Sequence, residues 1–324
     1  MSTCALAAAS GFVRERHDLA QHKPAVSQRH SSLGLTLVGA TAIATGVALS
    51  VLSAVALGSA DFIGGRAART GKIVTIVAVM QAAGLVAVGL LILLVAPPLP
   101  SVTTVTFGLV AGLANVLGLS ALYRGLAMGS MAVVAALSTV GSVAIPFAFS
   151  VIVLGTSPRL TQMLGVGLVL SASVVMAALS GRSLSRTAFM FGLVAALSFG
   201  VYFILLSRAA SAGLWALLTS RASAVTALLV FESTTVLVGG GVRRIRFDRR
   251  DSWLAAAGVL DLLGSGFVVA ALRFLPVGLI VPITGAYPVA TALLARAFLR
   301  ERLPVLAYGS VALALIGIAL IGQG

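Results

Sequence analysis

The sequence predicts an all-α polytopic membrane protein with ten transmembrane helices in two inverted five-helix repeats. Apolar residues make up 59% of the 324-residue chain and charged residues only 9%, a composition far from that of soluble domains. The apolar residues fall into ten long runs, and the last five runs repeat the first five. Because every backbone polar group in lipid needs a partner within the protein, runs of this length predict helices.

The ten predicted spans follow one another with mostly short connections. Most reach the roughly 20 residues that a helix needs to cross a hydrocarbon core of about 30 Å. They are rich in Gly and Ala, which let helices approach closely in a membrane. In chain order the predicted spans are 38–65, 73–96, 104–127, 129–154, 160–180, 187–207, 212–240, 252–274, 277–298 and 302–322.

The chain divides into an arm and two repeats. Residues 1–34 form a polar arm of mixed charge, which we expect to be disordered or to lie at the membrane surface. Its short apolar start has no basic region before it and is a poor signal peptide. Residues 35–180 form the first predicted repeat and residues 187–322 the second, with a short polar connection between them.

The two predicted repeats align residue by residue. Segment 58–68 aligns with 200–210 at an offset of 142. A unit with an odd number of spans crosses the membrane in opposite directions in its two copies, and such inverted repeats are typical of transporters with a site near the midplane. Pairs at an offset of 146 are Gly112 with Gly258, Asn115 with Asp261, Gly118 with Gly264, Ser138 with Thr284 and Pro158 with Pro304.

The net charge of +14 would favour a nucleic-acid partner in a soluble chain. Here the arginines lie in connections and near span ends, so we expect membrane lipids as partners and no nucleic acid. The three histidines lie in the arm, and the single cysteine, Cys4, excludes an intrachain disulfide. We therefore expect no metal, no cofactor and no catalytic residue in the spans.

Charge leaves the membrane orientation open. Most Lys and Arg follow spans one, three, five, seven and nine, which places those connections in the cytoplasm and both termini outside. Four basic residues of the arm, which precedes the first span, favour the opposite orientation: Arg14, Arg16, Lys23 and Arg29.

Three motifs resemble EamA-type members of the drug/metabolite transporter superfamily, which have ten spans in two EamA repeats. They lie at 58–65, 121–134 and 286–303, and the resemblance covers about 40–322. It implies a transporter, not an enzyme, that exports small metabolites, amino-acid-like compounds or drugs by alternating access across a bacterial inner (plasma) membrane. One departure is that the family's Gly-Glu-Arg turn remains only as Glu301-Arg302, so we expect no symmetric role for that glutamate.

Three acids lie in the predicted spans, namely Asp61, Glu232 and Asp261. Ionisable groups inside a membrane are costly and usually face a cavity or a partner. Asp261 and its counterpart Asn115 are each flanked by glycines at i±3, so we expect both to project into a central cavity. The alternatives are hydrogen bonding between helices for Asp261 and Asn115, and an interfacial position for Asp61.

Other polar side chains extend this predicted cavity. Arg221, about nine residues into span seven, is expected to pair with Asp61 or Asp261 or to bind an anionic substrate group. Tyrosines and hydroxyl residues of spans four, six and nine supply an amphipathic lining. The complete predicted substrate-binding set is Asp61, Gln81, Asn115, Ser138, Tyr202, Arg221, Asp261, Thr284 and Tyr287.

Prolines within spans free backbone carbonyls and permit bends. Pro282 and Pro288 in span nine, and Pro146 in span four, are therefore predicted hinges for gating, although ordinary packed bends would use the same residues. The sequence has no phosphate-binding loop, so uphill transport would need an ion gradient. Asp61 and Asp261 are the predicted proton-coupling acids, since low dielectric favours a protonated carboxyl, whereas facilitated diffusion needs no such group.

An intramembrane enzyme and a passive channel are the alternative functions. An enzyme needs a nucleophile, an acid–base pair or a metal, and the predicted spans contain no His or Cys. A channel is usually a symmetric oligomer with a ring of pore-lining residues, and the internal repeat argues against that. We expect a small-molecule substrate and a monomer or homodimer.

Overall fold

The computed structural model describes residues 25–68, 71–128, 131–178, 186–237, 251–299 and 305–323. The chain forms two compact units, Met1–Ala44 and Thr45–Gly324, and the packing described below belongs to the second. Every regular element in the described ranges is helical. Cys4 and Glu301-Arg302 lie outside the described residues, as does the arginine-rich connection 243–250.

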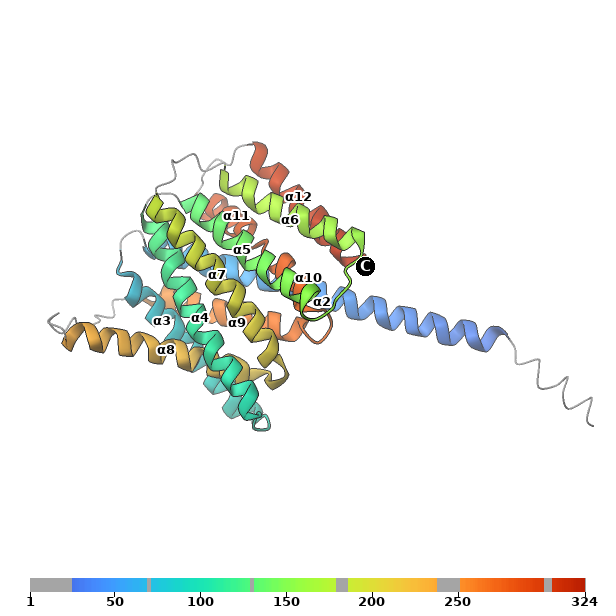
Figure 1. Cartoon of the computed structure of the whole chain (residues 1–324), viewed down its shortest axis with the longest axis horizontal. Coiled ribbons are helices and arrows are strands. Elements are labelled where there is room, and N and C mark those ends of the chain that lie inside the picture. The colour runs from blue at the N-terminus through green and yellow to red at the C-terminus, as the bar shows by residue number, and fades with distance from the viewer. Residues whose placement is uncertain are drawn as a thin grey trace, which may run out of the picture. The chain divides into compact units, whose positions relative to one another are not determined.

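Helices occupy both predicted repeats (Figure 1). In the first repeat they are α2 (Ala25–Ala68), α3 (Ile73–Val95), α4 (Val102–Ala127), α5 (Met131–Ile152) and α6 (Leu160–Ala178). In the second they are α7 (Arg186–Ala209), the 3-10 turn η1 (Ala210–Ala212), α8 (Leu214–Leu237), α9 (Asp251–Ala271), α10 (Val277–Thr284), α11 (Tyr287–Leu299) and α12 (Val305–Gly322).

The first helix begins earlier than the apolar run that predicted it. Residues 25–34, which were predicted to belong to the arm, form the start of α2. No proline occurs within the 44 residues of α2, whereas Pro24 directly precedes it. A proline before the first turn is compatible with a helix start, and its absence afterwards lets the helix continue.

Seven helical segments among the described residues are long and apolar enough to cross a membrane. Three further apolar helices are shorter, namely Leu137–Ile152, Leu160–Val175 and Tyr308–Gly322. The chain is therefore an integral membrane protein with helices in every predicted run, and the count of ten complete spans stays a prediction. The seven segments are Gly39–Ala68, Ile73–Val95, Val102–Ala127, Arg186–Ala212, Leu214–Thr234, Ser252–Ala271 and Val277–Phe298.

The connection between α3 and α4 illustrates how local sequence ends these helices. Ala96 adopts a left-handed conformation with φ of 45°, and its N–H donates to Ile92 O at 2.8 Å. Three prolines in 97–100 then prevent further helix. Ser101 restarts it as an N-cap, because its side chain accepts from Thr104 N at 3.3 Å.

Span nine consists of two helices. α10 ends at Thr284, with Pro282 inside its last turn, and Pro288 is the second residue of α11. The Gly285 carbonyl at the break accepts from the Ser173 hydroxyl at 3.3 Å, which satisfies one freed backbone group. Pro146, by contrast, lies inside a continuous α5. The gating roles of these prolines stay predictions.

Helices that are distant in the sequence pack against each other. α4 contacts both α7 and α8, α5 contacts α7, and α3 contacts α9. α6 and α12 also lie side by side, as Figure 1 shows. The helices of the two predicted repeats are therefore interleaved rather than forming two separate bundles.

Glycines form the closest helix crossings. A Cβ on Gly112 of α4 would overlap the Ser220 carbonyl oxygen of α8, and a Cβ on Gly258 of α9 would overlap that of Met80 on α3. Small residues at crossings let membrane helices gain dispersion energy along their backbones. Two further crossings of this kind are Gly118 of α4 with Phe199 of α7, and Gly264 of α9 with Leu57 of α2.

These crossings predict that Gly112→Ala and Gly258→Ala destabilise the protein. Each added methyl group must push two backbones apart, which costs about 1–3 kcal/mol. We expect a lower thermal unfolding midpoint in detergent for both variants. Gly167→Ala on α6 is the control, because a Cβ there meets nothing within 4 Å. Equal midpoints for all three variants would contradict the assigned crossings.

Candidate functional site

Arg221 is the most informative buried side chain. It is the eighth residue of α8, about two turns from the start of that helix, and only 1% of its surface is exposed. A guanidinium at membrane depth costs about 2.5–3.5 kcal/mol on insertion scales unless the protein satisfies it. Its partners therefore identify the polar centre of the fold.

Two helices, α3 and α9, present hydrogen-bond acceptors to Arg221. Its Nη1 donates to Gln81 Oε1 of α3 and to Asp261 Oδ2 of α9, and its bond to Asp261 is an ion pair. Its Nη2 donates to Ser265 Oγ at 3.1 Å. Tyr202 of α7 donates to the same Ser265 oxygen at 2.9 Å. We call these five residues the Arg221 cluster.

Local sequence explains why α9 supplies two members of the Arg221 cluster. Asp261 and Ser265 are spaced at i and i+4 and so share one helix face, and the Ser265 hydroxyl donates to Asp261 O at 3.0 Å. Gly258, one turn earlier, lets α9 approach α3. A Cβ on Gly84 of α3 would lie 3.3 Å from Gly258 O and 3.5 Å from the Arg221 side chain.

Asp61 lies in a second polar group, on α2. The Tyr123 hydroxyl of α4 donates to Asp61 Oδ1 at 3.3 Å and lies 3.7 Å from Met80 Sδ. Gly64 provides room for this tyrosine, because a Cβ there would overlap the Tyr123 hydroxyl. Asp61 is partly buried and within electrostatic range of Asp261. Among the described residues, no cation forms an ion pair with it.

Hydroxyl groups of α5 and α11 form a third polar group. Thr139 donates to the Tyr287 hydroxyl at 2.9 Å, and Ser138 hydrogen-bonds the same hydroxyl. Tyr287 is within electrostatic range of Asp61. Thr291, one turn further along α11, donates to Gly58 O at 2.9 Å and so ties α11 to α2 near Asp61.

The structure thus brings most of the predicted site residues together, but not all. Gln81, Tyr202, Arg221 and Asp261 meet in one cluster, while Asp61 and the Ser138–Tyr287 pair lie in neighbouring groups. Asn115 and Thr284 are buried, and neither Asn115 Nδ2 nor Thr284 Oγ1 has a hydrogen-bond partner among the described residues.

Ser265, Thr139 and Tyr123 belong to these polar groups but were missing from the predicted set, as was Thr291. Ser265 carried a usable signal, since it lies at i+4 from Asp261 on the same predicted face. Thr139 adjoins the predicted Ser138. Tyr123 carried none, because only the fold places it opposite Asp61. Among the described residues, no group of three or more His, Cys, Asp or Glu side chains is arranged to hold a metal ion.

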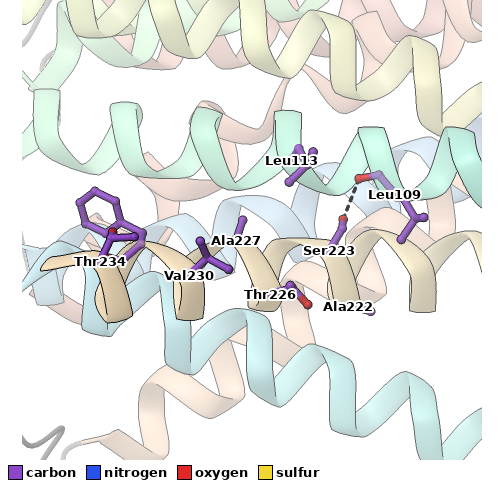
Figure 2. Close-up of a pocket in the computed structure, with 9 residues that line it drawn as sticks. Leu109, Leu113, Ala222, Ser223, Thr226, Ala227, Val230 and Thr234 are labelled. Atoms are coloured by element: carbon purple, nitrogen blue, oxygen red, sulfur yellow. Dashed lines mark hydrogen bonds between the residues drawn. The ribbon is translucent and has the colours of Figure 1, made fainter. Parts of the chain in front are cut away.

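A groove between α4 and α8 contains none of the predicted site residues. Its volume is roughly 640 Å³, and Figure 2 shows its lining side chains on the facing sides of the two helices, with Ser223 bonded to the Leu109 carbonyl at 2.7 Å. Leu113 and Val230 in its walls are exposed. Exposed apolar side chains on a membrane helix face acyl chains, so this groove belongs to the lipid-facing surface.

A solved structure shares this fold. A crystal structure of a protein matches with a TM-score of 0.68 over 87% of this chain and 98% of that chain, at 16% sequence identity. At that identity the similarity establishes the fold alone. Among curated proteins, none matches the sequence.

The second half of the chain also matches a protein family. Residues 186–323 match the EamA-like transporter family. The matched region includes α7 to α12 and therefore contains Tyr202, Arg221, Asp261 and Ser265. This match supports the resemblance to the drug/metabolite transporter superfamily, whose EamA-like family is one of transporters rather than enzymes.

The Arg221 cluster predicts a strong coupling between Arg221 and Asp261. Arg221→Met leaves a buried carboxylate without its cation, which costs about 3–5 kcal/mol, so we expect a marked fall in the thermal unfolding midpoint. Adding Asp261→Asn removes that charge and should recover most of the loss. Arg208→Met is the control, because Arg208 is exposed and stacks 5.9 Å from Phe107. Additive effects of the two cluster substitutions would contradict the ion pair.

Proposed function

We propose that the protein is a secondary transporter that moves small metabolites, amino-acid-like compounds or drugs across the membrane by alternating access. The observation that carries this proposal is the Arg221 cluster, in which α3 of the first half meets α7, α8 and α9 of the second half. Charged and hydrogen-bonding side chains at the contact between halves of a membrane protein are typical of a transport site.

Corresponding contacts support two inverted repeats. Gly118 contacts Phe199. The counterpart of Gly118, 146 positions later, is Gly264, and the counterpart of Phe199, 142 positions earlier, is Leu57. Gly264 and Leu57 also contact each other. A second pair of contacts follows the same offsets. Gly200 lies against Ile145, and their counterparts Gly58 and Thr291 lie against each other. A two-fold relation between the halves requires such paired contacts, whereas unrelated halves would not produce them.

The α3 and α8 helices follow the same relation at an offset of 140. Gly112 meets Ser220 and its counterpart Gly258 meets Met80, so Met80 corresponds to Ser220 and Gln81 to Arg221. Gln81 and Arg221 also hydrogen-bond each other. Two corresponding residues touch only where they lie beside the two-fold axis, so we place the centre of the transport pathway at this pair.

Alternating access requires one half to move against the other while the centre holds the substrate. The break between α10 and α11 gives the second half a bending point beside Tyr287. Export, and location in a bacterial inner membrane, follow from the family resemblance.

For energy coupling, we assign the proton-carrying role to Asp61 rather than Asp261. Asp261 is already compensated by Arg221, and protonating it would leave the buried guanidinium unpaired. Asp61 accepts one hydrogen bond, from Tyr123, and its protonation breaks no ion pair among the described residues. Its position near Asp261 lets its charge act on the Arg221 cluster.

Flux into proteoliposomes tests this function. We expect the wild type to concentrate at least one compound from radiolabelled amino-acid and drug pools when a pH gradient is imposed. Asp61→Asn keeps the bond from Tyr123 but cannot lose a proton, so it should lose concentrative transport and retain exchange of labelled for unlabelled compound. Glu232→Gln on α8 is the matched control.

Distinct results contradict distinct parts of this proposal. If the wild type moves no compound in any pool, the protein is not a transporter of these classes. If the wild type concentrates a compound without regard to the gradient, or Asp61→Asn concentrates it fully, Asp61 has no coupling role.

A further inference from the structure

Several buried side chains of the helices that pack near Arg221 have polar atoms without a hydrogen-bond partner among the described residues. Four buried side-chain polar atoms have no hydrogen-bond partner among the described residues, namely Gln81 Nε2, Asn115 Nδ2, Ser220 Oγ and Thr284 Oγ1. A buried donor without a partner costs about 1–3 kcal/mol. Three of the four belong to α3, α4 and α8, the helices that meet beside Arg221.

The orientation of the Gln81 amide is fixed by Arg221. A guanidinium has only donors, so the amide atom that faces its Nη1 must be the oxygen, Oε1. The amide nitrogen therefore points away from Arg221 with both of its hydrogens available. Gln81 is fully buried, which makes this nitrogen an oriented donor inside the protein.

Asn115 and Ser220 lie next to the same place. Ser220 precedes Arg221 in α8, and Gly112 of α4 packs on its carbonyl oxygen. Asn115 follows Gly112 by three residues, which is one helical turn or about 4.5 Å along the axis, and it is 3% exposed. In the two-fold relation proposed above, Asn115 is the counterpart of Asp261 and Gln81 that of Arg221, so this relation directs the Asn115 amide toward Gln81.

We propose that Gln81, Asn115 and Arg221 form a subsite for the carboxylate group of a small transported molecule. A carboxylate has only acceptors, and its two oxygens match the two amide nitrogens in kind and number. The guanidinium, which is already paired with Asp261, has five N–H donors, and a hydrogen bond to a charged carboxylate is stronger than one between neutral groups.

This inference rests on the proposed function and adds the chemical class of the substrate. Gln81→Glu provides its sharpest test. The new carboxylate keeps an acceptor toward Arg221, but it replaces the amide donor with a second acceptor and a negative charge. The variant should therefore repel a carboxylate ligand, and its own unfolding midpoint without ligand reports what the second buried carboxylate does to stability.

Binding is measured by thermal unfolding of the purified full-length protein in detergent. The probes are formate, acetate, 3-phenylpropanoate and L-phenylalanine, each beside its neutral carboxamide. We expect at least one carboxylate to raise the wild-type midpoint, with its carboxamide weaker by about tenfold or more in affinity. Gln81→Glu should abolish the shift, while Gln162→Glu, on the distant α6, should retain it.

Three results would overturn the subsite. They are the absence of any shift with all four carboxylates, equal shifts with carboxylates and carboxamides, and full retention of binding by Gln81→Glu. Each leaves the proposed transport intact if proteoliposomes still concentrate a compound. Conversely, carboxylate binding without flux would contradict the transport function and leave the subsite standing.

Discussion

A guanidinium buried in a membrane-spanning helix constrains the whole centre of this protein. Arg221 is 1% exposed, so its hydrogen bonds must all come from the protein or from a bound molecule. Acceptors from α3 and α9 meet this demand, and Tyr202 joins α7 through Ser265. The glycine crossing of α9 with α3 serves the same demand, because short polar side chains of both helices reach Arg221 only when the backbones are close.

The two halves contribute unequal chemistry to this centre. The second half supplies an opposite-charge pair, Arg221 and Asp261, while the residues that the proposed repeat pairs with them in the first half are the neutral amides Gln81 and Asn115. A buried ion pair fixes the relative position of its two helices strongly, since separating it exposes an uncompensated charge to low dielectric. Neutral amides exchange partners at a lower cost. We therefore expect α8 and α9 to move as one body and α3 and α4 to adapt around a bound molecule.

Much of the fold could be predicted from the sequence, and less of the site. Apolar runs located the helices because length and hydropathy are local properties, and aligned glycines identified the faces that cross. The partner of Arg221 was left open between Asp61 and Asp261, since that choice depends on how four helices pack. Tyr123 was missed as the partner of Asp61 for the same reason. The prolines of span nine predicted a bend in that span, but not that Ser173 of α6 supplies a compensating hydrogen bond to Gly285 at the interruption.

The order of the Arg221 cluster along the chain has a consequence for biogenesis. Arg221 precedes Asp261 by 40 residues in the chain, and an arginine at the helix centre has an insertion cost of about 2.5–3.5 kcal/mol. Gln81, 140 residues earlier, is by then already in the membrane and presents an amide oxygen. During synthesis the neutral partner therefore receives the arginine first, and the acid completes the charge balance when α9 follows.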